Sequence, residues 1–200
     1  MRLKASSGLL VAFEGLDQSG KQSQAELLRD RLTSLGRTVG LLSFPDYETP
    51  IGAEIGRALR GERHYRPDVM QLLYVANRYE YKDEIVREKE AGTILVCDRY
   101  LASSIAYGEA FGLDGAWLME MQKHLPQPDL TFLLDIAPDV SVKRKSAGRD
   151  KYESDLSLLA RVRDSYLRQS LRSGWVRLDA SRDKAAIAAD VYATVQPLVV

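Results

Sequence analysis

Two hydrophobic patterns alternate along this chain of 200 residues. Short apolar runs, each bounded by glycine, proline or polar residues, are typical of strands that are buried on both faces. We predict five such fully buried strands, at Leu9 to Phe13, Thr38 to Ser43, Thr93 to Cys97, Leu130 to Ile136 and Trp175 to Leu178.

Longer segments repeat apolar residues every three or four positions, which indicates amphipathic helices. We predict six of these, at Lys21 to Leu35, Ile51 to Leu59, Asp68 to Glu90, Gly115 to Lys123, Asp155 to Leu171 and Lys184 to Val195.

The order of these elements predicts the fold class. Strands that alternate with helices form right-handed crossover connections, which build a mostly parallel sheet with helices on both faces. We therefore expect a three-layer α/β fold with a five-stranded, mostly parallel sheet flanked by helices. No repeat, low-complexity tract or long linker divides residues 1–200, so we predict a single domain. Ligands of such sheets bind at the carboxyl ends of the strands.

Composition narrows the range of partners. The 28 basic and 28 acidic side chains cancel, and neither sign forms a long block. This balance argues against a nucleic-acid or a membrane partner. The chain starts without the long apolar segment of a secretory signal, and we expect a cytoplasmic protein. Its single cysteine, Cys97, lies in an apolar run, so we expect a small buried side chain rather than a nucleophile.

A glycine-containing loop joins the first predicted strand to the first predicted helix. Gly15 and Gly20 allow its backbone to turn tightly with the N–H groups inward, and the following helix presents its positive dipole end. Lys21 can reach the outer phosphates of a nucleotide. This context matches a Walker A motif, although an ordinary glycine-containing turn is the alternative. We predict that the ATP phosphates bind at Gly15, Leu16, Asp17, Gln18, Ser19, Gly20, Lys21, Gln22 and Ser23.

One position of this loop departs from the motif. A serine or threonine usually follows the lysine because its hydroxyl binds Mg²⁺, and here the residue is Gln22. A glutamine still offers a carbonyl oxygen, and Mg²⁺ can be held largely by phosphates and water. We expect Mg²⁺ as the cofactor and leave its protein ligands open.

Further short motifs follow the loop in order. They are Phe44-Pro45-Asp46-Tyr47, Leu73-Tyr74-Val75-Ala76-Asn77-Arg78, Asp98-Arg99-Tyr100 and the segment Arg144 to Glu153. Together with the loop motif Phe13-Glu14-Gly15-Leu16-Asp17, they make the chain resemble the thymidylate kinase family over nearly its whole length. The resemblance implies a P-loop kinase fold, transfer of the γ-phosphoryl group of ATP to dTMP, Mg²⁺ and a homodimer. A related kinase with another acceptor is one alternative, and a nucleotide-binding module with little catalysis is another.

The motif Asp98-Arg99 follows the third predicted strand. Asp98 stands where a Walker B carboxylate faces the phosphates, and the resemblance implies that it organises Mg²⁺ and water. A planar guanidinium suits a phosphate monoester, and the resemblance implies that Arg99 binds the phosphate of dTMP. A helix-capping aspartate followed by a solvated arginine is the alternative. Many family members carry a further arginine where this chain has Tyr47, so phosphate binding rests more heavily on Arg99.

Tyr74 and Arg78 lie four residues apart in a predicted helix, so they share one face. An aromatic ring can stack on a pyrimidine while a guanidinium donates to a ring carbonyl. The resemblance implies these two roles. Without it, Tyr74 in the core and Arg78 on the surface would be the more ordinary arrangement.

Ser104 and Tyr107 follow the Asp-Arg-Tyr triplet on a helical turn. By resemblance, Ser104 lies near the base, and Tyr107 packs where a ribose 2′-hydroxyl would lie, which disfavours ribonucleotides. A packing role for Tyr107 is the alternative. The resemblance also implies that Asp17 accepts a hydrogen bond from the 3′-hydroxyl of dTMP and that Phe44 and Tyr152 belong to the dTMP site.

A basic segment at about 143–153 contains a glycine and joins two helical stretches. The thymidylate kinase family supplies a catalytic arginine either from the phosphate loop or from a lid, and the loop position here is Gln18. The resemblance therefore implies that this segment is the lid, with Arg149 as the catalytic arginine and Arg144 beside the adenine. A basic surface loop without a catalytic role is the alternative. The catalytic residues that we predict are Lys21, Asp98, Arg99 and Arg149.

Overall fold

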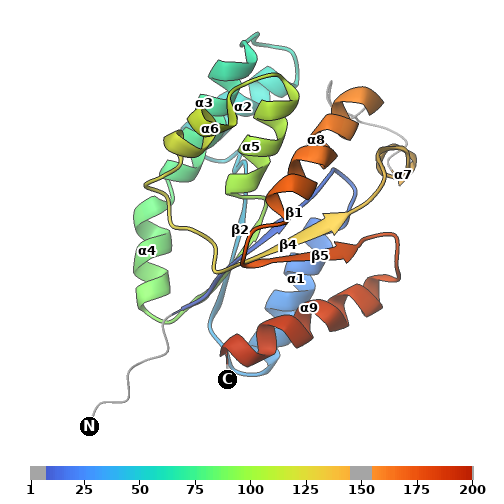
Figure 1. Cartoon of the computed structure of the whole chain (residues 1–200). Helices are drawn as coiled ribbons and strands as arrows, with labels where there is room; N and C mark the ends of the chain where they lie inside the picture. The colour runs from blue at the N-terminus through green and yellow to red at the C-terminus, as the bar shows by residue number, and fades with distance from the viewer. Residues whose placement is uncertain (1–7, 145–154, 200) are drawn as a thin grey trace.

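Five parallel strands form the centre of the protein (Figure 1). The computed structural model describes residues 8–144 and 155–199. The strands lie in the order β2-β3-β1-β4-β5, so the chain occupies one half of the sheet and then the other, with β1 at the centre. Their bounds are β1 Leu10–Glu14, β2 Val39–Ser43, β3 Ile94–Asp98, β4 Leu130–Asp135 and β5 Trp175–Asp179.

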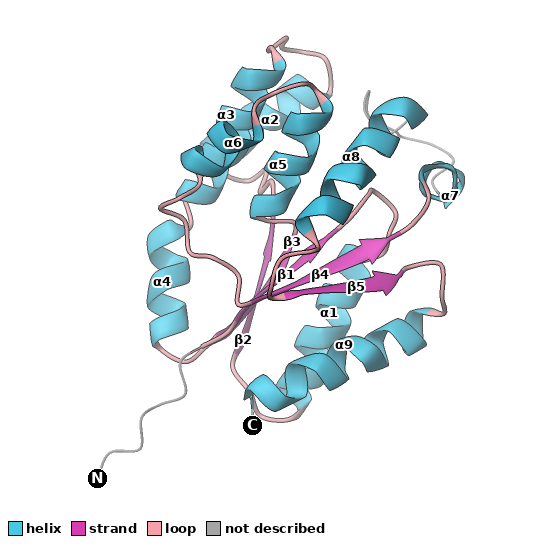
Figure 2. Ribbon diagram, viewed as in Figure 1, coloured by secondary structure: helices cyan, strands magenta, loops and turns pink. Residues whose placement is uncertain are grey.

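Helices cover both faces of this sheet (Figure 2). On one face α1 packs against α9, and on the other α5 packs against α8. Helix α3 packs on α2, α5 and α6 and extends the second helical layer away from the sheet. These layers confirm the predicted α/β fold. The helix bounds are α1 Lys21–Ser34, α2 Pro50–Leu59, α3 Pro67–Tyr79, α4 Lys82–Glu90, α5 Leu101–Ala110, α6 Gly115–Met121, α7 Pro138–Arg144, α8 Leu156–Gln169 and α9 Lys184–Val199.

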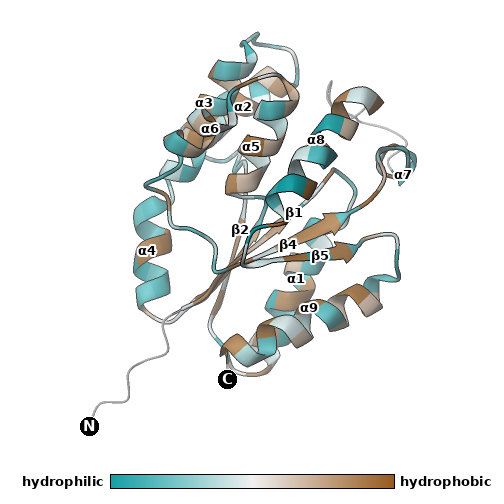
Figure 3. Ribbon diagram, in the orientation of Figure 1, coloured by the Kyte–Doolittle hydropathy of each residue, from teal (hydrophilic) through white to brown (hydrophobic). Residues whose placement is uncertain are grey.

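Burial of the strands follows their position in the sheet. Every residue of β1 and β4 is buried, because these strands have neighbours on both sides and helices on both faces. The edge strands β2 and β5 are partly exposed, and in β5 only Leu178 is buried. The prediction of five fully buried strands is therefore wrong for the two edge strands. Figure 3 shows the hydrophobic residues gathered on the sheet and on the inner sides of the helices.

The helix predicted from Asp68 to Glu90 is in fact two helices, α3 and α4, which are separated at Glu80 and Tyr81. Contacts with the loop after β2 hold this break. The Tyr81 hydroxyl donates to the Asp46 carboxylate, and the Asn77 amide donates to the Asp46 carbonyl oxygen at 3.2 Å. The turn thus depends on a residue more than thirty positions earlier in the chain, which a local pattern does not reveal.

Two of the helices in the described residues have no counterpart among the six predicted helices. The helical turn expected around Ser104 and Tyr107 belongs to α5, in which most residues are buried, so the helix has no polar face and no amphipathic pattern. α7 is only 7 residues long. Cys97 is a buried thiol, as expected, and burial raises its pKa.

Over residues 8–144 and 155–199, no helix is both long enough and apolar enough to cross a membrane.

Candidate active site

β1 runs directly into the loop that the sequence predicts to bind phosphates, and α1 begins at the end of that loop. Gly15 has a φ of 140°, and a Cβ atom there would lie 2.4 Å from the carbonyl oxygen of Leu134, so the position requires glycine. Gly20, with a φ of 92°, makes the turn into α1. Gln18 also has a positive φ, of 59°. The backbone therefore curls as a Walker A motif requires.

Lys21 is the first residue of α1, and its ammonium group lies inside the loop. Nζ donates to the carbonyl oxygen of Leu16 at 2.8 Å, and the residue is buried. Burial, together with the nearby charge of Arg99, lowers the pKa of Lys21 to about 8. The loop therefore holds a desolvated positive charge that a phosphate group would stabilise.

Helix α7 contacts the outer side of the loop. The Ser141 hydroxyl donates to the carbonyl oxygen of Asp17 at 2.7 Å. The Arg144 guanidinium donates to the carbonyl oxygens of Gln18 at 3.1 Å and Ala180 at 2.9 Å. Arg144 thus connects the loop to the residue that follows β5, and its predicted contact with adenine stays a prediction.

Asp98 ends β3 and pairs in register with Phe13 of β1, next to the loop. Its Oδ1 is buried and has no hydrogen-bond partner among the described residues. A free carboxylate oxygen is a ligand that Mg²⁺ prefers, so Asp98 fits the metal role predicted for it. The Gln22 amide instead donates to Glu26 on the exposed side of α1, at 2.9 Å. The described residues contain no group of three His, Cys, Asp or Glu side chains that could hold a metal by themselves.

A cavity of about 170 Å³ opens beside the loop, between α2, α3, α5 and the residues that follow β1, β2 and β3. It lies at the carboxyl ends of the strands, where the fold class predicts a ligand. Seven of the residues predicted to bind dTMP line it, although they come from five separate parts of the chain. These seven are Asp17, Phe44, Tyr74, Arg78, Arg99, Ser104 and Tyr107.

Arg99 lies at the end of the cavity that is nearest to the loop. Its φ of 63° is unusual for a residue with a long side chain and turns the guanidinium toward the loop. Nη2 donates to Asp17 Oδ1 at 2.5 Å, and the Tyr107 hydroxyl donates to Asp17 Oδ2 at 3.0 Å. Burial alone would raise the pKa of Asp17, but the charges of Arg99 and Lys21 outweigh burial and lower it. The carboxylate therefore stays ionised and oriented.

Arg78 lies at another part of the cavity wall, on α3. Its Nη1 donates to Ser104 Oγ at 2.7 Å and to the carbonyl oxygen of Tyr74 at 3.1 Å. The guanidinium stands over the Phe44 ring at 5.9 Å. Nε is buried and has no partner among the described residues. The alternative in which Arg78 is a surface residue is wrong, because Arg78 is only 2% exposed.

Three residues next to Arg99 were not predicted from the sequence. Glu14 is fully buried at the end of β1, and its carboxylate accepts hydrogen bonds from the backbone N–H groups of Tyr100 and Ser103. It also accepts from the hydroxyls of Ser103 at 2.6 Å and Tyr166 at 3.1 Å. Both hydroxyls in turn contact Arg99. A charged residue at the end of an apolar strand could have drawn attention to Glu14, whereas nothing local marks Tyr166 on α8.

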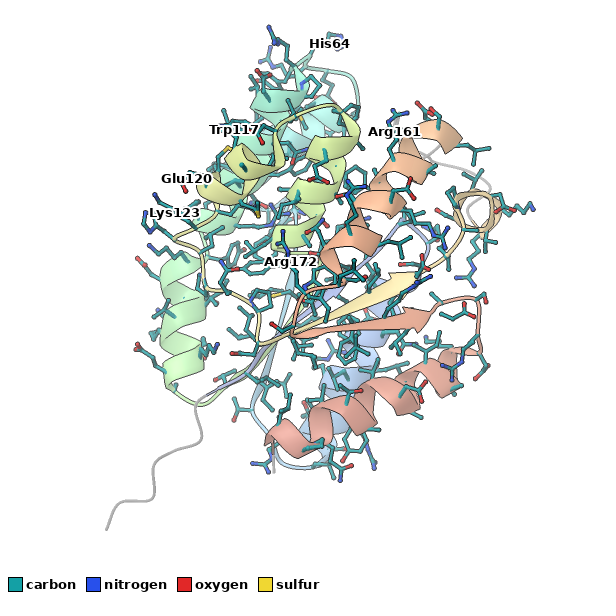
Figure 4. The ribbon with its side chains drawn as sticks, viewed as in Figure 1. His64, Trp117, Glu120, Lys123, Arg161 and Arg172 are labelled. Atoms are coloured by element: carbon teal, nitrogen blue, oxygen red, sulfur yellow. The ribbon has the colours of Figure 1, made fainter. Side chains whose placement is uncertain are left out.

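Eight further residues line the cavity, and none of them was predicted to bind dTMP. The cavity is also lined by Pro45, Tyr47, Leu59, Pro67, Met70, Gln71, Ser103 and Phe111. His64 is exposed in the loop between α2 and α3 (Figure 4), and His124 is exposed too. The predicted lid residues Arg149, Tyr152 and Glu153 lie outside the described residues.

Comparison with known proteins gives consistent results. A family model described as "Thymidylate kinase" matches residues 13–191. The thymidylate kinase of Schizosaccharomyces pombe is 37% identical over 75% of this chain and 71% of its own length. A probable thymidylate kinase of Pyrobaculum aerophilum is 36% identical over 94% of this chain and 97% of its own length. The solved thymidylate kinase of Candida albicans aligns with a TM-score of 0.81 and 27% identity over 96% of this chain and 92% of that chain.

Proposed function

This chain belongs to the thymidylate kinase family, and we propose how its residues transfer the γ-phosphoryl group of ATP to dTMP. An oxygen of the dTMP phosphate forms the new bond to the γ-phosphorus, and the bond from that phosphorus to the bridging oxygen of ADP breaks. The products are dTDP and ADP. No covalent enzyme intermediate takes part, so the protein acts by positioning two nucleotides and balancing charge. The observation that carries this proposal is the cavity beside the phosphate loop, with Arg99 between the two.

The loop binds the donor. Its backbone N–H groups and the Lys21 ammonium hold the outer phosphates of ATP, and Arg144 flanks the adenine. Asp98 would hold Mg²⁺, directly or through water, and its Oδ1, which has no hydrogen-bond partner among the described residues, supports this assignment. Bound Mg²⁺ supplies positive charge to the phosphate oxygens during transfer. Gln22 and Ser23 stay predicted contacts of the phosphates.

The cavity binds the acceptor. Arg99 directs N–H donors to the dTMP phosphate while Asp17 keeps it in place and accepts a hydrogen bond from the 3′-hydroxyl of the sugar. Because the free carboxylate is already oriented by Arg99 and Tyr107, little ordering is left for the moment of binding. The pyrimidine stacks on Tyr74, and Arg78 donates to a ring carbonyl from a desolvated position.

Several elements of this proposal rest on the sequence alone. Arg149 is our candidate for the arginine that reaches the transferred phosphoryl group, and Tyr152 for a contact to the acceptor sugar. The segment 143–153 is our candidate for the lid. A single domain over 1–200, a homodimer and a cytoplasmic location also stay proposals.

The activity is tested by mixing the protein with ATP and Mg²⁺ and measuring ADP formation with each of a panel of acceptors. We expect dTMP to give the highest kcat/KM among dTMP, dUMP, CMP and free thymidine. A higher kcat/KM with another acceptor would show that dTMP is not the preferred substrate. Binding of both nucleotides with only background ADP formation would instead identify a module that has lost catalysis.

Tyr107 provides a test of sugar selection. Replacing it with alanine should lower the preference for dTMP over the ribonucleotide 5-methyl-UMP by about tenfold or more, because a small side chain leaves room for the 2′-hydroxyl. Tyr107→Phe keeps the ring and should keep the preference, although it loses the 3.0 Å hydrogen bond to Asp17. The ratio of kcat/KM values measures the effect. An unchanged ratio in Tyr107→Ala would assign the ring to packing only.

Lys21 makes ATP binding sensitive to pH. Its pKa is lowered to about 8 in the free protein, so the ammonium loses its proton as the pH rises above that value. Phosphates stabilise the charged form, and binding must then take up a proton. We expect the Kd for ATP to rise roughly 30-fold between pH 7.5 and 9.5. Calorimetry in two buffers with different ionisation enthalpies measures the proton uptake. Lys21→Met should show weak binding with a flat profile, and a flat profile in the unmodified protein would contradict this assignment.

A further inference from the structure

Gln71 lines the cavity from α3 and has no role in the site described so far. The residue is only 2% exposed, and its Oε1 is buried without a hydrogen-bond partner among the described residues. Buried side-chain amides are nearly always hydrogen-bonded, because an unpaired polar atom in a low-dielectric interior destabilises the fold. An unpaired amide in the wall of a substrate cavity therefore points to a partner on the ligand.

The position of Gln71 on α3 relates it to the base-binding residues. Gln71, Tyr74 and Arg78 are spaced by three and four residues, so they share one side of the helix, and all three line the cavity. At a rise of 1.5 Å per residue, Gln71 and Arg78 are about 10 Å apart along the helix axis. Tyr74 lies between them. A pyrimidine stacked on Tyr74 would have a polar side chain at each end, within hydrogen-bond reach of its edges.

The rest of the wall near Gln71 is apolar. The N-terminal half of α3 contributes Pro67, Met70 and Gln71 to the cavity, and of these only the glutamine has a hydrogen-bonding side chain. Helix α5 packs against α3 (Figure 1), and Phe111, the residue that follows α5, also lines the cavity. In such surroundings a hydrogen bond to a ligand is strengthened, and a polar ligand edge that lacks a partner is rejected.

We propose that Gln71 is a specificity-determining residue for the acceptor base. When the nucleotide binds, the Gln71 side chain turns its Oε1, which is buried in the free protein, toward the base; Oε1 then accepts a hydrogen bond from the N3–H of thymine, and Nε2 donates to one neighbouring ring carbonyl. The other carbonyl takes the donor of Arg78, since a guanidinium can only donate. A glutamine amide reads adjacent donor and acceptor groups on a base with two hydrogen bonds. This inference rests on the proposed function, because it requires a thymine nucleotide in the cavity.

The experiment compares dTMP with N3-methyl-dTMP, in which the N3–H donor is absent. In the unmodified protein we expect kcat/KM to be at least about 50-fold lower for the methylated nucleotide. In Gln71→Leu, kcat/KM for dTMP should fall about 30-fold while the value for N3-methyl-dTMP changes little, so the two substrates become nearly equal. The KM for ATP should stay unchanged.

Gln122 offers a matched control. It is also a buried glutamine whose Oε1 has no partner in the described part of the chain, but it follows α6, does not line the cavity, and its Nε2 donates to the Leu118 carbonyl oxygen. Gln122→Leu should keep the discrimination of the unmodified protein. Because Gln71 Oε1 has no hydrogen-bond partner within residues 8–144 and 155–199, Gln71→Leu and Gln71→Met should leave the Tm without nucleotide unchanged or higher. The rise in Tm on adding dTMP should be smaller in both variants.

Each result bears on a different claim. Discrimination that persists in Gln71→Leu, or a loss that is equal for both nucleotides, would overturn the role of Gln71. A lower Tm of both variants without nucleotide, with an unchanged Tm shift on adding dTMP, would overturn it too, because it would assign the amide a structural role. If the unmodified protein does not phosphorylate dTMP, the proposed function is contradicted instead. This measurement does not depend on the variants.

Discussion

Replacing Arg99 with alanine is expected to lower kcat/KM for dTMP about a thousandfold. The guanidinium lies between the phosphate loop and the acceptor cavity, where it contacts the Gly15 carbonyl oxygen at 3.2 Å and Asp17 at 2.5 Å. In the proposed mechanism its removal takes away the positive charge that holds the dTMP phosphate in line with ATP. Charged groups that stabilise a transferring phosphoryl group contribute about 10²- to 10³-fold or more to the rate.

Two further variants make this result specific. Arg99→Lys keeps the charge but loses the planar fork of donors, so we expect a loss of about a hundredfold. Arg29 is partly exposed on α1 and pairs with Asp30, so Arg29→Ala should leave the kinetics unchanged. Steady-state kinetics with dTMP as the varied substrate measures these effects, and Tm values show whether each variant is folded. An Arg99→Ala protein that stays within tenfold of the original would remove Arg99 from the acceptor site.

Replacing Glu14 with alanine is expected to lower the free energy of unfolding by about 3–5 kcal/mol. The carboxylate is fully buried and accepts hydrogen bonds from two backbone N–H groups and two hydroxyls, so its loss leaves several buried donors without partners. These donors belong to Tyr100, Ser103 and Tyr166, which come from the turn after β3, from α5 and from α8. The variant should therefore loosen the contact between α5 and α8.

Glu14→Gln removes the negative charge of the side chain but keeps its size. The amide keeps the size of the carboxylate but places donors where acceptors are needed, so we expect a smaller loss, of about 1–3 kcal/mol. Urea unfolding followed by circular dichroism measures both values. Glu120 is exposed on α6 beside Lys123 (Figure 4), and Glu120→Ala should have almost no effect. A loss below about 1 kcal/mol in Glu14→Ala would show that the buried donors find other partners.

Glu14 also links the stability of the fold to the chemistry of the site. Ser103 and Tyr166, which donate to Glu14, both contact Arg99 as well. The unusual backbone of Arg99, with a φ of 63°, is thus held by the same buried cluster. We therefore expect Glu14→Gln to lower kcat/KM for dTMP even when the protein is fully folded at the assay temperature.

Local patterns predicted most of the elements. All five strands lie within one residue of their predicted ends, because a strand buried in a parallel sheet must be a short apolar run bounded by turn residues. The edge strands β2 and β5 differ only in exposure, which depends on the strand order. The break between α3 and α4 was missed because contacts with Asp46 hold it.

The candidate site also combines residues that the sequence predicted with residues that only the fold brings together. The sequence alone determined the tight turn between β1 and α1, because a loop of the Walker A type needs Gly15, Gly20 and Lys21 at set positions after a strand, and the resemblance implied acceptor roles for Arg78 and Arg99. Only the tertiary structure decided that Tyr166 contacts Arg99 and donates to Glu14, and that Gln71 Oε1 is buried without a partner among the described residues. The physical reason is the separation along the chain of the residues that decide each property. Backbone conformation follows from neighbouring residues, whereas burial and hydrogen-bond partners depend on segments that the fold brings together from far apart in the chain.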